Sequence, residues 1–169
     1  MSCFTLALGE IYILINGGNL LSLLDFLKVL GAIVLSTFAN SAILFLIISF
    51  IHSQNAFGTL STIVGTVIGF LMGIYVPIGN LPKYVQQIVK IFPGSYSVSL
   101  FRNIIMEKPM DVTFDQAPNE LISDFVISMG IDIQVGGITI TPLLAIIILL
   151  ATGIIFYGIS ILRLRTKKA

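Results

Sequence analysis

The chain has 169 residues, of which 56% are apolar and only 10% charged, and its formal net charge is +1. Soluble domains carry about 25% charged residues, so this composition excludes an ordinary water-soluble fold. The near-zero net charge gives no basis for binding nucleic acid or an acidic substrate.

Four apolar runs predict membrane-embedded helices. A helix needs about 20 apolar residues to cross a hydrocarbon layer of about 30 Å, and segments 26–51, 57–78 and 138–162 reach that length. The run 3–16 is shorter and contains Glu10, so we predict a partial span there. The sequence therefore predicts a single all-α membrane domain over 1–169, a polytopic helix bundle.

Polar side chains inside these runs are candidates for function. An acid is costly in lipid, so Glu10 lies either near the interface or against a substrate or proton. Asn40 and Ser41 form a mid-span polar pair, which indicates an interhelical hydrogen bond or a substrate contact. Lys28 lies near one end of its span, where snorkelling or an ion pair with Asp25 can hold it.

Three glycines in segment 57–78 share a spacing of four: Gly65, Gly69 and Gly73. On one continuous helix they form a groove over which another helix can approach closely. Two interpretations remain open: the groove lies at a subunit or gating interface, or it packs against a neighbour in the same chain.

The segment between the last two spans has a different character, with six of the eight acids and four of the six prolines. Helices are predicted over 82–92 and 95–107, the second with Ser95 as N-cap, and neither is long enough to span. We expect this pair to lie in or dip into the interface. The remaining stretch, 107–137, is predicted as an outside loop with a short helix that ends at Gly130.

Orientation follows from the basic residues beside the spans. Arg163, Arg165, Lys167 and Lys168 come directly after the last span, so we expect a cytoplasmic C-terminus. The acidic segment then lies outside, and segments 26–51 and 138–162 both run from outside to inside.

No catalytic set is visible in the sequence. It holds one cysteine, Cys3, and one histidine, His52, too few for a disulfide framework or a His/Cys metal site. It contains no Gly-Lys pair, which a phosphate-binding loop requires. We therefore expect neither an enzyme nor a bound metal or cofactor, and any ATP must be hydrolysed elsewhere.

The run 69–82, GFLMGIYVPIGNLP, is followed by VQQIVKIFP at 85–93 and then by Tyr96 and Arg102. In order and spacing these pieces resemble the ABC type-2 exporter permeases. The resemblance implies that 57–78 is the fifth of six helices and that a re-entrant helix pair follows it outside the membrane. The residues that match the re-entrant motif are Pro77, Leu81, Pro82, Pro93, Tyr96 and Arg102.

The resemblance also implies function and partners. It implies a membrane subunit in the plasma or inner membrane that pairs with a second permease copy or homologue and with a separate ATPase, surrounded by membrane lipid. The cargo would be a drug, a lipid or a glycan, and 57–78 would line its path. The resemblance covers nearly all of this sequence but about half of a permease. The alternative is a small non-transporting membrane protein that binds a partner helix.

Overall fold

The computed structural model describes residues 2–17, 20–51, 53–115 and 117–166. Most of the described chain is helical, and its two strands have only two residues each, which confirms the all-α prediction. Its helices are α1 (Ser2–Ile15), α2 (Leu23–Ile48), α3 (Gln54–Leu71), η1 (Ile78–Asn80, a 3-10 turn), α4 (Lys83–Ile91), α5 (Pro93–Thr113), α6 (Asn119–Met129) and α7 (Pro142–Thr166). A two-stranded antiparallel hairpin, β1 (Gln134–Val135) and β2 (Ile138–Thr139), precedes α7.

Helices α2 and α7 form the centre of the bundle. Among the described helices, these two are long and apolar enough to cross a membrane, with mean hydropathies of 2.1 and 2.5. The Phe38 and Tyr157 rings lie 5.4 Å apart, and Arg163 lies 3.2 Å from the centroid of the Phe50 ring. The contact made by the later residue of α2, Phe50, is also made by the later residue of α7, Arg163. The two helices therefore run in the same direction. The predicted topology requires that relative direction.

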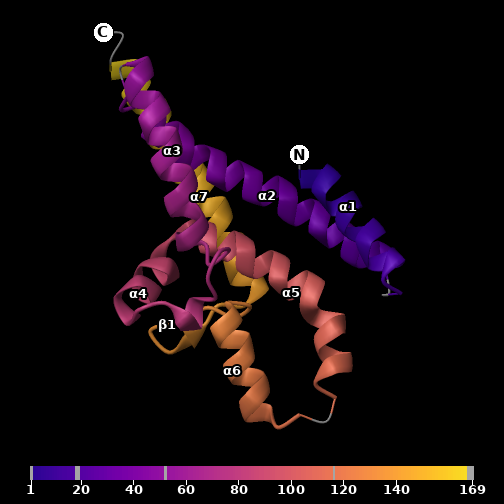
Figure 1. Ribbon diagram of the computed structural model, residues 1–169. Helices are drawn as coiled ribbons and strands as arrows, with labels where there is room; N and C mark the ends of the chain where they lie inside the picture. Colours follow the sequence, from indigo (N-terminus) through magenta and orange to yellow (C-terminus); the bar gives the residue numbers. More distant parts are fainter. Residues whose placement is uncertain (1, 18–19, 52, 116, 167–169) are drawn as a thin grey trace.

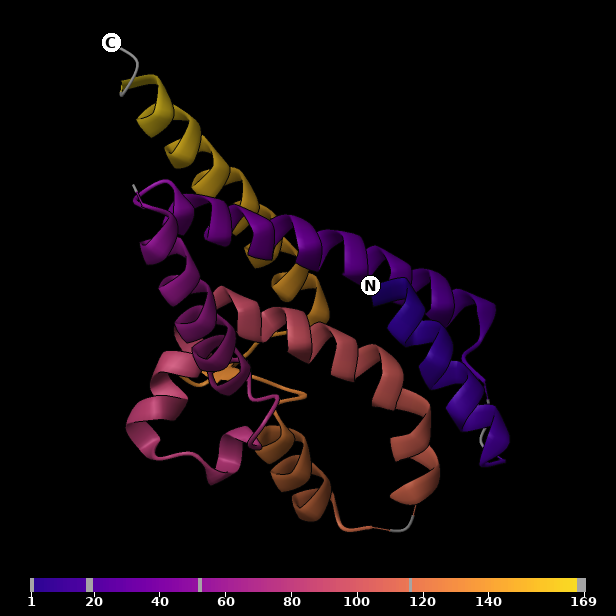
Figure 2. The ribbon, with the colours of Figure 1, turned by 45° about the horizontal axis from the view of Figure 1, so that its top comes forward.

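Helix α5 packs across the pair and completes the core. The core consists of three alanines, three aliphatic side chains and one tyrosine, from the three helices and from the residue just before the hairpin: Ala32, Ala39, Tyr96, Leu100, Ile133, Ala145 and Leu149. Small residues allow close helix approach in lipid, where apolar surface gains little from burial. Helix α1 lies along the N-terminal part of α2, and α4, α6 and the hairpin lie at the end of the molecule away from the C-terminus (Figures 1 and 2).

Helix α3 is shorter than the helix predicted over 57–78. It ends at Leu71, and Gly73 follows with φ of 65°. The Gly73 N–H donates to the carbonyl of Phe70 and the Ile74 N–H to that of Gly69, each at 3.0 Å. This is a Schellman termination, in which glycine takes the left-handed position after the helix. At 1.5 Å per residue, 18 residues reach about 27 Å, so a full crossing by α3 stays a prediction.

The outside segment holds more helix than predicted. Helix α5 begins at Pro93 and continues to Thr113 through Pro109, so the predicted N-cap at Ser95 and the loop start at 107 are wrong. The physical reason is that proline suits the first helical position, where its missing N–H costs nothing. The short helix and its end at Gly130, with φ of 67°, are confirmed.

Candidate functional site: a carbonyl clamp on α5

One face of α5 binds main-chain carbonyls from the ends of α3 and α6. Ser95 Oγ donates to the carbonyl of Leu71 at 2.9 Å. Arg102 donates through Nη2 to the carbonyl of Gly73 at 2.8 Å and through Nη1 to that of Met129. We call Ser95, Arg102 and these three carbonyls the carbonyl clamp.

The clamp follows from the chemistry of helix ends. The last carbonyls of a helix have no intrahelical donor and carry the negative end of the helix dipole. A guanidinium offers five donors in a fixed fork, so Arg102 can bind two such ends at once. Burial lowers the pKa of Arg102 from its ordinary value, but a guanidinium stays charged in proteins. The charge therefore holds the ends of α3 and α6 together.

Two further side chains of α5 extend the clamp toward the hairpin. Ser99 Oγ and Asn103 Nδ2 both donate to the carbonyl of Ile131, at 2.5 and 2.7 Å. Spacings of three and four residues put Ser95, Ser99 and Arg102 on one side of α5. The segment after α6 is thus fixed on the same helix as the end of α3.

Close packing around the clamp requires glycine at two positions. A Cβ at Gly130 would lie 2.4 Å from Ile78 Cδ1 and 3.2 Å from Arg102 Nη1. A Cβ at Gly79 would lie 2.7 Å from Ser128 Cβ. The η1 turn therefore sits directly on the end of α6.

The other residues of the predicted re-entrant motif shape the turns around the clamp. Tyr96 is buried and donates its hydroxyl to the carbonyl of Lys90, which closes the corner between α4 and α5. Burial raises the pKa of Tyr96, so the hydroxyl remains a donor. The remaining members flank the short elements: Pro77 before η1, Leu81 after it, Pro82 before α4 and Pro93 at the start of α5.

The mid-span polar pair makes interhelical hydrogen bonds, as one of the two interpretations predicts. Asn40 Nδ2 of α2 donates to Ser97 Oγ of α5 at 3.3 Å. The hydroxyls of Ser41 and Tyr157, from α2 and α7, lie 2.9 Å apart. These bonds tie α2 to both of its neighbours.

The three glycines of α3 do not form one groove on one helix. Gly73 lies beyond the helix end, and a Cβ at Gly69 would lie 2.2 Å from the ring of Tyr75 in the following turn. A Cβ at Gly65 would meet nothing within 4 Å. A spacing of four indicates a helix face only while the helix continues, and it ends before Gly73.

The close approach between central helices uses a glycine that the sequence did not single out. A Cβ at Gly153 of α7 would lie 2.2 Å from the ring of Phe38 in α2. Because Gly153 has no glycine neighbour at a spacing of four, no periodic pattern points to it.

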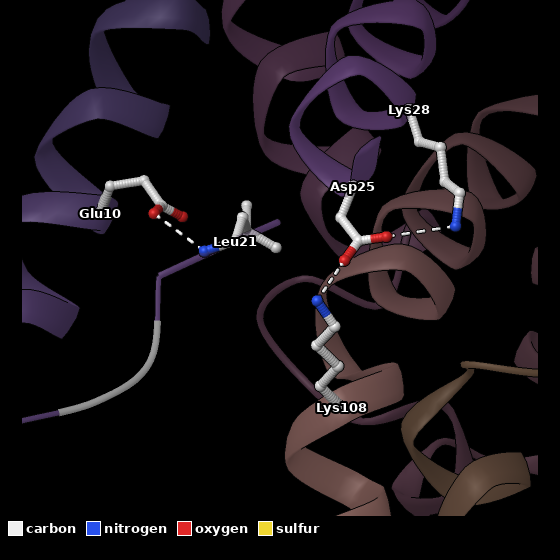
Figure 3. A network of polar contacts seen from close by, with 5 residues as sticks. All are labelled: Glu10, Leu21, Asp25, Lys28 and Lys108. Carbon is white, nitrogen blue, oxygen red and sulfur yellow. Dashed lines mark hydrogen bonds and ion pairs between the residues drawn. The ribbon is translucent and has the colours of Figure 1, made fainter. Parts of the chain in front are cut away.

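A second polar cluster lies where α2 begins (Figure 3). The predicted ion pair is confirmed, since Lys28 Nζ lies 3.2 Å from Asp25 Oδ1. Lys108 Nζ of α5 approaches the other oxygen, Oδ2, at 2.7 Å, a partner that no local pattern indicates. Glu10 accepts a hydrogen bond from the N–H of Leu21 at 3.2 Å, a structural contact just before α2.

Comparison with known proteins adds a family. Residues 4–106 match the family model described as ABC-2 type transporter. The matched range runs from α1 into α5 and includes the clamp residues Ser95 and Arg102. Neither a curated protein nor a solved structure matches the chain.

Proposed function

Because this chain belongs to the ABC-2 type transporter family, as a transmembrane component without ATPase activity of its own, we propose that it forms part of the translocation path of an exporter. The energy would come from ATP hydrolysis on a separate subunit, and the cargo would be a drug-, lipid- or glycan-like molecule. The family match over most of the chain is the observation that carries this proposal.

The orientation belongs to the same proposal. Arg163 and Arg165 lie in the last turn of α7, and basic residues beside a span favour the cytoplasmic side. The parallel course of α2 and α7 is compatible with both helices entering from outside. We therefore assign the chain to the cell membrane, with α4, α6 and the hairpin outside and the C-terminus inside.

The open side of α3 supports pairing with a second membrane subunit. Apart from Gly69, no residue of α3 is buried, and Ile63 and Val67 are 55% and 45% exposed. Gly65 lies in the same stretch with free space above it. We propose that α3 faces the second permease copy or homologue and that Gly65 and Gly69 lie where the two subunits approach each other. Asn40, Ser41 and Gly73 would lie behind that surface and hold its neighbouring helices.

The carbonyl clamp links movement of α3 to movement of the outside helices. Arg102 binds the carbonyl of Gly73, two residues after the end of α3, and that of Met129, the last residue of α6, so a shift of α3 during transport would pull the outside helices with it. We propose that this link transmits motion between the translocation path and the outside segment.

The test uses two glycines that have equally free surroundings in this chain. Gly65→Leu on α3 and Gly158→Leu on α7 each add a side chain where a Cβ meets nothing within 4 Å. In the assembled transporter, Gly65→Leu should reduce efflux of fluorescent drug and lipid analogues and the cross-linking between α3 helices. Gly158→Leu should change neither. Insertion and expression of both variants are followed by membrane fractionation.

The outcome also separates the alternatives. Mass spectrometry of the tagged, purified complex should identify a subunit with a phosphate-binding loop. If Gly65→Leu leaves efflux and cross-linking unchanged, α3 faces lipid and the subunit interface lies elsewhere. If it abolishes cross-linking while no cargo is exported even by the unmodified complex, the chain is a non-transporting partner-binding protein.

A further inference from the structure

Ser36 is a buried polar residue in the middle of α2. It lies between Ala32 and Ala39 on the face that packs into the core and is 7% exposed. Its hydroxyl has no hydrogen-bond partner among the described residues. A serine inside a helix can donate to the carbonyl one turn earlier, as Ser160 of α7 does toward Phe156 at 2.7 Å. An unpaired buried hydroxyl lowers stability and is rare in proteins, so the core would gain from a polar partner at Ser36.

A polar contact between α2 and α5 lies one helical turn from Ser36. Asn40 Nδ2 donates to Ser97 Oγ at 3.3 Å, and Asn40 follows Ser36 by four residues, which makes them neighbours on one side of the helix. Nearer the start of α2, Lys108 pairs with Asp25, so α2 and α5 run antiparallel along each other (Figures 1 and 2). A movement of α5 by one turn, about 6 Å, toward the start of α2 would bring Ser97 from Asn40 to Ser36.

The ion pairs at the start of α2 permit this movement. Lys108 would leave Asp25, whose side chain is only 9% exposed and needs a cation beside it. Lys28 remains there, because it lies on the same helix with its Nζ 3.2 Å from Asp25 Oδ1. Ile104, one turn before Lys108, would then face Asp25, so no second acid takes the place of the lysine. The side chain of Lys108 is 59% exposed, so its ammonium can be hydrated.

A movement of α5 in the opposite direction has no such support. It would place Ser97 against Leu44, whose side chain has no hydrogen-bonding atom. It would also carry the ammonium of Lys108 toward Val29, which is buried. The polar groups therefore favour one direction, toward the start of α2.

We propose that α5 has two registers along α2, one helical turn apart. In the first register Ser97 meets Asn40, and in the second it meets Ser36. One-turn displacements of one packed element past another occur in protein switches. Ser95 and Arg102 of the carbonyl clamp lie on α5, so the ends of α3 and α6 would move with it. The shift is a property of the chain itself and stands or falls independently of export.

Double electron–electron resonance between two spin labels measures the register. In the full chain in lipid nanodiscs, Cys3 is replaced by serine, and labels are attached through Ile48→Cys on α2 and Glu107→Cys on α5. Both positions are exposed, so the labels leave the contact between the helices intact. Glu107 lies near the start of α2 and Ile48 at its end, so the shift should lengthen this distance by about 6 Å. A control pair, Ile48→Cys with Leu143→Cys on α7, should keep its distance.

Substitutions in α2 should select between the registers. Asn40→Leu nearly keeps the side-chain volume but removes the donor, so the ratio of the longer to the shorter distance should rise about two- to tenfold, which corresponds to one hydrogen bond. Adding Ser36→Ala should cancel that rise. Adding Thr37→Val instead, which removes a hydroxyl from the exposed neighbouring position, should leave it unchanged. Circular dichroism verifies that each variant is folded.

Two results would overturn the proposal. A single, unchanged distance in Asn40→Leu would mean that α5 has one register. A longer distance that persists after Ser36→Ala is added would mean that Ser36 is not the second partner. If Asn40→Leu fails to fold, Ser36→Asn replaces it, because it offers an amide at the second position while Asn40 stays in place. An unchanged distance in that variant would overturn the proposal equally.

Discussion

The contact between Phe38 and Gly153 offers the sharpest test of how the two central helices pack. A Cβ at Gly153 would lie 2.2 Å from Cε1 and 2.5 Å from Cδ1 of the Phe38 ring, whereas carbon atoms in contact normally lie about 3.5–4.0 Å apart. Gly153→Ala must therefore displace the ring by more than a small adjustment. Tyr157, whose ring centroid lies 5.4 Å from that of Phe38, restricts where it can go.

The loss of stability caused by this overlap is obtained by comparing two alanine variants of the same helix. Gly158→Ala also adds one methyl group to α7, but at a position with nothing within 4 Å. Replacing glycine by alanine in a helix gains up to about 1 kcal/mol in both variants, so that gain cancels in the comparison. Overpacking costs about 1–3 kcal/mol and applies to Gly153→Ala alone. We expect Gly153→Ala to be less stable than Gly158→Ala by that amount.

The measurement is unfolding of the purified protein in mixed micelles by sodium dodecyl sulfate, followed by circular dichroism. Adding Phe38→Leu to Gly153→Ala should recover part of the loss, because a branched aliphatic side chain can rotate away from the new methyl group. Equal stability of the two alanine variants, within about 0.5 kcal/mol, would refute the ring-over-glycine contact.

Two other predictions concern orientation and the clamp. With the native cysteine replaced by serine, Glu120→Cys should react with a membrane-impermeant thiol reagent in intact cells and Arg165→Cys should not; the reverse pattern would invert the topology. Arg102→Gln should destabilise the protein by about 1.5–3 kcal/mol, the usual worth of hydrogen bonds to a charged group, and should speed amide exchange of Gly130 and its neighbours more than that of Ala39. Uniform exchange in both regions would show that the clamp does not hold the end of α6.

The features that the sequence predicts are those that depend on near neighbours or on hydropathy. Two long apolar runs predict α2 and α7 because a helix satisfies its own backbone in lipid. Asp25 and Lys28 pair because they are three residues apart on one helix. Gly130 ends α6 because the left-handed position after a helix favours glycine.

The clamp could not be predicted because its acceptors are main-chain carbonyls. Every residue has one, so the partners of Ser95 and Arg102 leave no signature in the sequence. Lys108 and Asp25 meet only because α5 packs on α2. The end of α3 could have been predicted locally, because Gly73 is followed by Pro77 and a glycine shortly before a proline is typical of a helix end. The regular spacing of Gly65, Gly69 and Gly73 favoured a continuous helix instead.

Helix α5 connects α2, α7 and the end of α3. It contacts α2 and α7 in the core, binds the end of α3 through Ser95 and Arg102, and reaches the start of α2 through Lys108. A rigid shift of α3 alone would break the charged hydrogen bond from Arg102 to Gly73, worth about 1.5–3 kcal/mol, and the neutral one from Ser95 to Leu71. A joint shift of α3 with α5 would keep both. The contacts therefore favour α3 and α5 moving as one unit against α2 and α7, where the Asn40–Ser97 bond and the Lys108–Asp25 ion pair would be the ones exchanged.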